Sequence, residues 1–326
     1  MARPSLLRIG EYLGERFPVP VTLILGIALT GAAYAAAQSQ TISGGAPLIL
    51  DGTALGGVFM VFLFLLHLRV FDEHKDFELD SVTRPDRPVQ RGVISLDQLK
   101  IVGAIAIAGQ IVLALLAGLV PAAVYAVVIV YSVLMLFEFF VKDWLEARLV
   151  WYALSHTLVM SILALALAVR FTIRGDIDLS PALYGLLVLC LTSFFAIDVL
   201  RKLWAPESEI EGLDSYSKAF GIKKGAVLGA VLIGLSAIIG GWVGWQLGGR
   251  IPWLTVVALT TLWGFYEIRG FVREPVARRA KRLELVGGVH HLVIFIGFVV
   301  VAGYINGVVF AFDDHFFTLG VDMGGS

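Results

Sequence analysis

The stretch DEHKDFELD, residues 72–80, places five carboxylates in nine residues directly after the apolar run FMVFLFLLHLRVF. Asp72, Asp76 and Asp80 are spaced by four. On an α-helix this spacing leaves a net rotation of about 40° per step, so the three side chains form one stripe about 12 Å long. Like charges at this spacing destabilise a helix, which indicates that a cation neutralises them. Carboxylates without His or Cys suit hard ions, and Mg²⁺ is the usual ion where phosphate completes the shell.

The residues that follow could hold phosphate oxygens. Arg84, Arg87 and Arg91 come after the acidic stripe, and Pro85 and Pro88 exclude a continuous helix there. Guanidinium forks on a rigid turn beside a metal site are suited to a diphosphate. A solvated acidic helix end followed by ordinary positive charge is the alternative.

A second polar stretch, IDVLRKLWAPESEIEGLDSYSKAFGIKKG, has similar chemistry. It begins with Asp198 at the end of an apolar run, followed by the cations Arg201 and Lys202. Its further candidate ligands for a metal or a diphosphate are Glu207, Glu209, Glu211 and Tyr216. Two such stretches on one face predict the two halves of a single site.

The rest of the chain shows what must position these residues. It has 326 residues, of which 58% are hydrophobic and only 16% charged, with a mean hydropathy of +0.85. Soluble domains carry roughly 25% charged residues, so the composition predicts an all-α membrane protein. Nine apolar runs are long enough to span a bilayer: 19–38, 55–71, 101–119, 122–141, 149–170, 181–203, 226–247, 251–268 and 285–310. A cleavable signal peptide is the alternative for the first run, but its length and late start favour a retained helix.

The distribution of Lys and Arg predicts the orientation. With the N-terminus inside, the inner segments hold 22 of the 25 basic residues. We therefore expect the N-terminus and both polar loops, 69–100 and 198–224, to lie on the cytoplasmic face of a bacterial-type inner membrane, and the C-terminus outside. The basic inner surface is interpreted as topology and contact with membrane lipids, and no nucleic-acid module is present.

The first polar stretch resembles the first signature of the UbiA-type intramembrane prenyltransferases, NDxxDxxxD followed by R…RP…G. The residues that match or replace its positions are Asp72, Glu73, Asp76, Asp80, Arg84, Arg87, Pro88 and Gly92. Asp72 replaces the Asn and Glu73 replaces an Asp, so both positions keep oxygen ligands. The resemblance implies nine transmembrane helices that form a bundle around a lipid-accessible central cavity, with both signature loops on one face. It covers residues 1–326 as one membrane domain.

The second stretch departs from the family pattern DxxxD, which has a Gly four residues after its second Asp and a Ser or Thr soon after. Gly212 and Ser215 are similar to that tail, but the positions of the two acids hold Trp204 and Ser208. The ligand of the second metal therefore stays open among Asp198, Glu207, Glu209 and Glu211.

The resemblance implies two Mg²⁺ ions, one per loop, that hold the diphosphate of a polyprenyl donor. The residues expected to carry catalysis are Asp72, Asp76, Arg87 and Asp198, with Arg84, Arg91, Arg201, Lys202 and Tyr216 on the diphosphate. An allylic carbocation would form in a dry cavity and react with an aromatic or lipid acceptor. Two alternatives are a terpene cyclase, which needs no acceptor, and a transporter, whose ion ligands would lie nearer the bilayer midplane.

Some residues near the inner ends of the predicted spans have two interpretations. Trp151, Tyr152, His156 and Tyr266 could line the cavity, but aromatic side chains also form belts at membrane interfaces, and we favour the belt. Glu138 could pair with Lys142 four residues later, or it could face the site as a base on the acceptor side.

Overall fold

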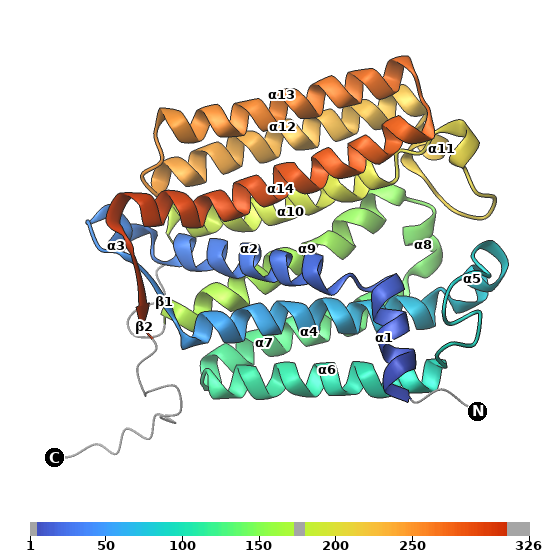
Figure 1. Cartoon of the computed structure of the whole chain (residues 1–326), viewed down its shortest axis with the longest axis horizontal. Helices are drawn as coiled ribbons and strands as arrows, with labels where there is room; N and C mark the ends of the chain where they lie inside the picture. The colour runs from blue at the N-terminus through green and yellow to red at the C-terminus, as the bar shows by residue number, and fades with distance from the viewer. Residues whose placement is uncertain (1–4, 173–179, 312–326) are drawn as a thin grey trace.

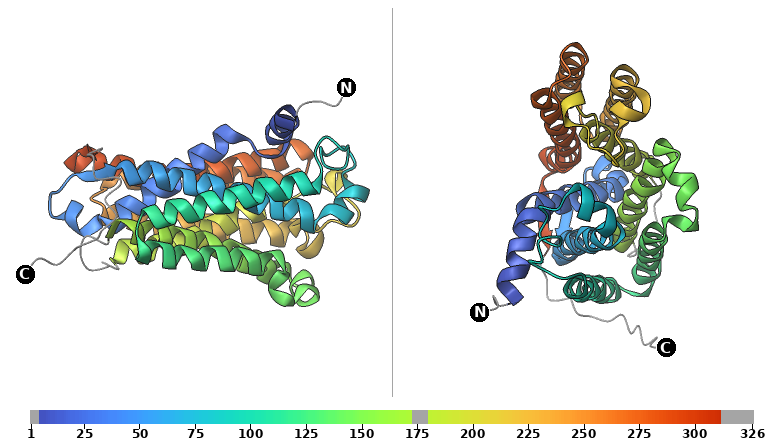
Figure 2. Two further views of the ribbon diagram at one scale, coloured as in Figure 1. Left: turned by 90° about the horizontal axis from the view of Figure 1, so that it is seen from below. Right: turned by 90° about the vertical axis from the view of Figure 1, so that its right-hand side faces the viewer.

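The computed structural model describes residues 5–172 and 180–311. Within these ranges nine helices are long and apolar enough to cross a membrane, as predicted. In chain order they are α2 (Val19–Ala37), α4 (Gly52–Lys75), α6 (Leu96–Leu116), α7 (Leu119–Leu136), α9 (Leu149–Thr172), α10 (Pro181–Arg201), α12 (Ile222–Gln246), α13 (Ile251–Arg273) and α14 (Ala277–Asn306). They run side by side along the long axis of the molecule (Figures 1 and 2).

Short elements close the two ends of the bundle. At one end lie α1 (Ser5–Arg16), α5 (Phe77–Thr83), the 3₁₀ turn η1 (Glu138–Phe140), α8 (Lys142–Glu146), the 3₁₀ turn η2 (Pro206–Ser208) and α11 (Tyr216–Phe220) (Figure 1). At the other end lie α3 (Ser39–Ser43) and two parallel strands, β1 (Leu48–Asp51) and β2 (Val308–Ala311). Both acidic stretches thus lie at the end that carries α1, whereas residues 312–326, predicted to lie outside, are not among those described.

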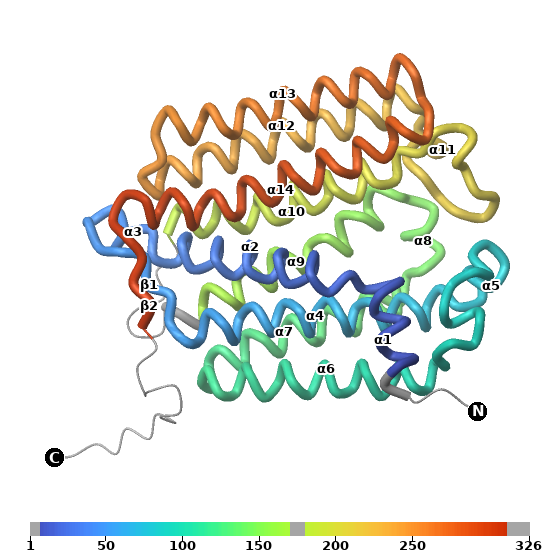
Figure 3. The backbone as a smooth tube through the Cα atoms, in the orientation of Figure 1, coloured from blue at the N-terminus to red at the C-terminus, as the bar shows by residue number. Residues whose placement is uncertain are grey.

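Helix α2 packs against α4, α9, α10 and α14 and is the centre of the main hydrophobic core. It can do so because its second half consists largely of Ala and Gly, whose small side chains let neighbouring backbones approach closely. A methyl group on Gly31 would lie 2.5 Å from Val299 Cγ2 of α14, so only Gly permits this contact. The backbone trace shows α2 and α14 side by side over much of their length (Figure 3).

Helix starts and stops follow local sequence signals. Ser95 caps α6 in a capping box with Gln98, and Ser180 caps α10, which begins with Pro181. Pro85 and Pro88 follow the end of α5, and residues 84–94 form turns, as their prolines predict. Both polar stretches are thus irregular connections between two spanning helices: the first joins α4 to α6, and the second joins α10 to α12.

Candidate active site

The acidic stripe continues from α4 into α5 across a slight break at Asp76. Asp76 is the last residue before α5 and has φ −94° and ψ 5°. The helical hydrogen bonds nevertheless continue, because the Asp76 N–H donates to the Asp72 carbonyl at 2.9 Å and the Asp80 N–H donates to the Asp76 carbonyl at 2.8 Å. Asp72, Asp76 and Asp80 are thus connected by helical hydrogen bonds four residues apart, as their spacing predicted.

Asp72 and Asp76 are the two carboxylates of this stripe that the protein leaves weakly paired. The Asp72 side chain is 50% exposed, and its nearest cation is Arg69 Nη1 at 3.9 Å. Asp76 is half-buried, and no described residue donates a hydrogen bond to its side chain or lies within ion-pair distance of it. Burial, together with the negative charges of Asp72 and Asp80, outweighs the attraction of Lys75 and raises the pKa of Asp76 to about 6. A cation would relieve this unfavourable state, so the pair fits a hard metal ion.

The other two predicted metal ligands of this stretch already have strong partners. Asp80 is buried and forms an ion pair with Arg87. Glu73 has a side chain with no exposed surface, and its Oε1 lies 2.9 Å from Arg16 Nε and 2.7 Å from Arg69 Nη2. The structure therefore turns Glu73 toward α1, and a metal role for Glu73 and Asp80 stays a prediction.

Of the three arginines that were predicted to bind phosphate in the first loop, two already form ion pairs with acidic side chains. Arg87 holds Asp80, and Arg91 lies across α1, with Nη2 at 3.2 Å from Glu11 and 2.9 Å from Glu15. Arg84 differs from both, because its Nε is buried and has no hydrogen-bond partner. Since a buried donor without a partner costs free energy, Arg84 is the guanidinium best suited to receive an added oxygen ligand.

Asp198 is the centre of the second loop. Its carboxylate accepts from Arg201 Nη2 at 3.1 Å and from the Tyr216 hydroxyl at 2.9 Å, and Lys202 Nζ lies 3.2 Å away. The Tyr216 N–H also donates to the Lys202 carbonyl, so the loop folds back onto the end of α10. Burial and the charge of Asp198 raise the pKa of Tyr216, so its hydroxyl stays protonated and donates a hydrogen bond to the carboxylate. The structure thus gathers four of the predicted residues of this loop.

The three glutamates of the second loop point to different partners. Glu207 Oε1 accepts from the Ala277 N–H at 2.7 Å, where it binds the start of α14. Glu209 accepts from the Ser215 hydroxyl at 2.6 Å, and Glu211 is exposed. None of them lies with Asp198, and in the described part of the chain no group of three or more metal-ligating side chains comes together. Which acid of this loop binds a second metal therefore stays a prediction.

The two acidic loops lie close together. A methyl group on Gly212, which has φ +83°, would lie 3.7 Å from Leu79 Cδ1 and 3.7 Å from Thr83 Cγ2. Leu79 and Thr83 belong to α5, so the tip of the second loop lies beside the helix that carries Asp80. Figure 1 shows α5 beside this loop at one end of the bundle.

The structure also brings together polar residues that sequence reasoning missed as a group. Lys75 Nζ lies 3.0 Å from Glu138 Oε1 and donates to the Tyr152 hydroxyl at 2.9 Å, and His156 Nε2 lies 3.2 Å from Glu138 Oε2. The predicted alternative in which Glu138 pairs with Lys142 is wrong, since the kink at η1 turns Glu138 inward and Lys142 lies 3.7 Å from Glu146. Lys75 lies inside DEHKD, but its partner is 63 residues later in the sequence, so no local pattern shows the pair.

The interface-belt interpretation holds for only some of the aromatic residues. Trp151 is 57% exposed and Tyr266 66% exposed, as a belt requires. Tyr152 and His156 instead turn toward the acidic stripe, where His156 lines a cavity of about 20 Å³ together with Asp72 and Lys75. This cavity is far smaller than the predicted central one.

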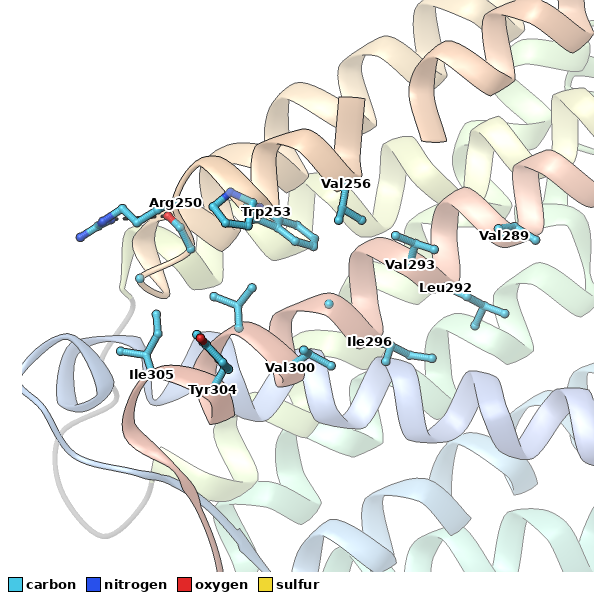
Figure 4. A pocket seen from close by; sticks show the side chains of 15 residues that line it. Arg250, Trp253, Val256, Val289, Leu292, Val293, Ile296, Val300, Tyr304 and Ile305 are labelled. Atoms are coloured by element: carbon cyan, nitrogen blue, oxygen red, sulfur yellow. Dashed lines mark hydrogen bonds between the residues drawn. The ribbon is translucent and has the colours of Figure 1, made fainter. Parts of the chain in front are cut away.

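A larger space of about 700 Å³ lies between α13 and α14, close to the strand end of the bundle (Figure 4). It is an apolar groove lined by Trp253, Ile296 and Tyr304, with Arg250 at its end. The acidic loops lie at the opposite end, so this groove is not where the charged chemistry takes place.

The nine apolar helices define an integral, multi-pass membrane protein, and the acids at one end of the bundle define a candidate metal and phosphate site. Residues 24–297 match the UbiA prenyltransferase family, which is most of the chain, and the protein therefore belongs to that family of membrane prenyltransferases. A comparison with curated protein sequences gave no significant match.

Two solved structures have a similar fold. A structure described as "Structural and mechanistic insights into the biosynthesis of Digeranylgeranylglyceryl phosphate synthase in membranes" is 18% identical, with a TM-score of 0.60 over 91% of this chain and 99% of that one. The apo structure of a UbiA homologue from Aeropyrum pernix K1 is 14% identical, with a TM-score of 0.64 over 87% of this chain and 98% of that one. At these identities the similarity establishes the fold alone, and it confirms the predicted all-helical membrane architecture.

Proposed function

We propose that the protein transfers a polyprenyl group from an isoprenoid diphosphate to an aromatic or lipid acceptor in a Mg²⁺-dependent reaction. The observation that carries the proposal is the state of Asp76, a half-buried carboxylate beside Asp72 that has no partner among the residues the structure describes. Burial raises the pKa of Asp76 to about 6. A protein tolerates such a group where a bound cation stabilises it. The family match supports prenyl transfer as the reaction class.

Asp72 and Asp76 would hold one Mg²⁺, and Asp198 would contribute to a second. Bound Mg²⁺ would supply the positive charge that stabilises the leaving diphosphate. Arg84, whose Nε has no partner, would donate a hydrogen bond to a phosphate oxygen, and Lys202 would add charge from the second loop.

The position of Gly212 beside Leu79 and Thr83 supports a single site built from both loops. In that site Asp198 and its cations would hold the same diphosphate as the first loop. The apolar walls next to Asp72 would exclude water from the allylic cation. From the charge distribution we place both loops on the cytoplasmic face of a bacterial-type inner membrane.

The test is incubation of the purified protein with radiolabelled farnesyl, geranylgeranyl and longer diphosphates, with Mg²⁺ or with EDTA, and with or without a membrane lipid extract. Mg²⁺-dependent diphosphate release that yields a larger lipid product supports transfer. Acceptor-free cyclic hydrocarbon would instead assign the protein as a terpene cyclase. If no donor is consumed under any of these conditions, the proposal fails.

The matched control uses two acids from the same stretch. Asp76→Asn should abolish turnover, whereas Glu78→Gln should not, because Glu78 is exposed and lies on the first turn of α5. Equal losses of turnover in both variants would show that the reaction depends on the net negative charge of the stretch and not on the Asp72–Asp76 pair.

A further inference from the structure

The small cavity beside Asp72 has room for one polar atom among apolar walls. Its volume is about 20 Å³, and roughly 10–15 Å³ is enough for a water-sized group. Leu68, Phe71, Met135 and Leu136 form the apolar part, and Asp72, Lys75, Ser132 and His156 the polar part. The cavity thus joins the acidic stripe on α4 to His156 on α9.

The tautomer of the neutral His156 ring is set by its neighbours. Its Nδ1 lies 2.8 Å from the Tyr152 carbonyl oxygen, which can only accept, so Nδ1 carries the proton. In the neutral ring the lone pair is then on Nε2. Nε2 is buried, and none of the described residues forms a hydrogen bond with it. The ring cannot easily turn, because it stacks on Tyr152 at 4.1 Å and meets the Phe139 ring edge-on at 5.8 Å.

Glu138 lies where it would stabilise a charged imidazole. Its Oε2 is 3.2 Å from His156 Nε2 and is likewise buried without a hydrogen bond, so the contact is electrostatic rather than an aligned hydrogen bond. Lys75 Nζ at 3.0 Å and the Tyr152 hydroxyl, which donates to Oε1 at 2.9 Å, stabilise the negative charge of Glu138. The carboxylate is therefore ionised at neutral pH.

The backbone around Glu138 is strained, which indicates that its position matters. Glu138, Phe139 and Phe140 have φ of 48°, 53° and 59°, a left-handed run of three non-glycine residues. This conformation costs about 1–2 kcal/mol per residue, and it persists only where the surrounding structure imposes it. Here it turns Glu138 to Lys75, Tyr152 and His156.

We propose that His156 is the general base that takes the proton from a hydroxyl group of the acceptor, with Glu138 as its positioning and charge-stabilising partner. The proposal rests on the proposed function and narrows its acceptor to an alcohol or a phenol. The hydroxyl oxygen would sit in the small cavity, between His156 Nε2 and the prenyl carbon that leaves the diphosphate near Asp72.

The step balances without another reactant. The bond between the allylic carbon and the diphosphate oxygen breaks, and its electron pair leaves with the diphosphate. The acceptor oxygen forms a bond to that carbon, and its proton moves to His156 Nε2. The products are an allylic ether, diphosphate and an imidazolium that Glu138 stabilises until the proton returns to water.

The experiment uses the full-length protein with radiolabelled geranylgeranyl diphosphate, Mg²⁺, and three probe acceptors: 1-octanol, a 4-alkylphenol and diacylglycerol. Total diphosphate release reports ionisation, and ether formation reports transfer. For His156→Gln and Glu138→Gln we expect release within about threefold of the parent protein and ether formation reduced at least thirtyfold. For His156→Ala we expect added imidazole to restore ether formation at least fivefold, which a purely structural role would not allow.

His290→Gln is the matched control. His290 is also a buried histidine whose Nε2 has no hydrogen-bond partner, but it lies on α14 and bonds Thr260. We expect this variant to keep both activities. Thermal unfolding of each variant shows whether that variant has folded. If His156→Gln has not folded, imidazole rescue of His156→Ala decides the role of His156.

Each outcome decides between the two proposals. If the parent protein releases no diphosphate, the proposed function fails. If it releases diphosphate but forms no ether with any probe, or if the His156 variants form ether normally, the base assignment is overturned and the proposed function stands. Loss of release and transfer together in His156→Gln, without rescue of His156→Ala, also overturns it.

Discussion

Two acids of the same stretch, three residues apart, should respond to mutation in different ways. Glu73 and Asp76 both match or replace acidic positions of the family signature, but Glu73 is fully buried between Arg16 and Arg69, whereas Asp76 has no partner among the described residues. Glu73→Gln should therefore destabilise the fold, and Asp76→Asn should remove metal-dependent activity without destabilising it.

The magnitude for Glu73→Gln follows from its contacts. Removing one partner of a buried ion pair costs about 3–5 kcal/mol. Arg16 and Arg69 are 17% and 24% exposed, and Gln keeps one hydrogen-bond acceptor, so we expect about 2–3 kcal/mol. At roughly 2–4 °C per kcal/mol, the midpoint of thermal unfolding should fall by about 4–12 °C.

The assay compares three variants in detergent without metal. Asp76→Asn should leave the unfolding midpoint unchanged or raise it, because it removes repulsion from Asp72 and Asp80. Mg²⁺-dependent diphosphate release by Asp76→Asn should fall at least a hundredfold, and Glu78→Gln should match the parent in both measurements. The reasoning is refuted if Asp76→Asn lowers the midpoint as much as Glu73→Gln, or if Glu73→Gln loses Mg²⁺ dependence at an unchanged midpoint.

Further predictions concern pH and the second loop. The pKa of Asp76 is about 6 in the folded protein, above its ordinary value of 3.8. The metal-free protein should therefore lose stability as pH rises from about 4 to 6, which is measured as a fall in the midpoint of thermal unfolding. Asp76→Asn should remove most of that fall. Tyr216→Phe removes the hydroxyl that donates to Asp198, so it should raise the donor KM several-fold in steady-state kinetics and leave the unfolding midpoint within about 2 °C. Gly212→Ala places a side chain at φ +83°, and the resulting backbone strain should cost about 1 kcal/mol in thermal unfolding; an unchanged midpoint would argue against a left-handed backbone at this position.

Hydropathy and spacing predicted the nine spans and the helical acidic stripe, because these depend on local sequence alone. The choice of partners was not predictable in the same way. Arg69 and Glu73 are four apart, and that spacing could have shown their pairing. Arg16 reaches Glu73 only because α1 folds across the end of the bundle, and no local pattern contains that approach.

The same holds for the cluster around Glu138. Its inward position depends on a left-handed kink in a sequence without glycine, which propensities do not anticipate. Lys75, Glu138 and His156 come from three elements, so only their packing makes them one group. The central position of Asp198 in the second loop could not be predicted from spacing either, because it depends on tertiary contacts such as the hydrogen bond from Tyr216.

The central claim is that both acidic loops form one Mg²⁺-diphosphate site. The most direct measurement is calorimetric titration of inorganic diphosphate into the purified protein, with and without Mg²⁺. Binding should require Mg²⁺, should be lost in both Asp76→Asn and Asp198→Asn, and should persist in Glu78→Gln. Binding of equal affinity without Mg²⁺, or unchanged binding in either of the two Asp variants, would contradict the claim.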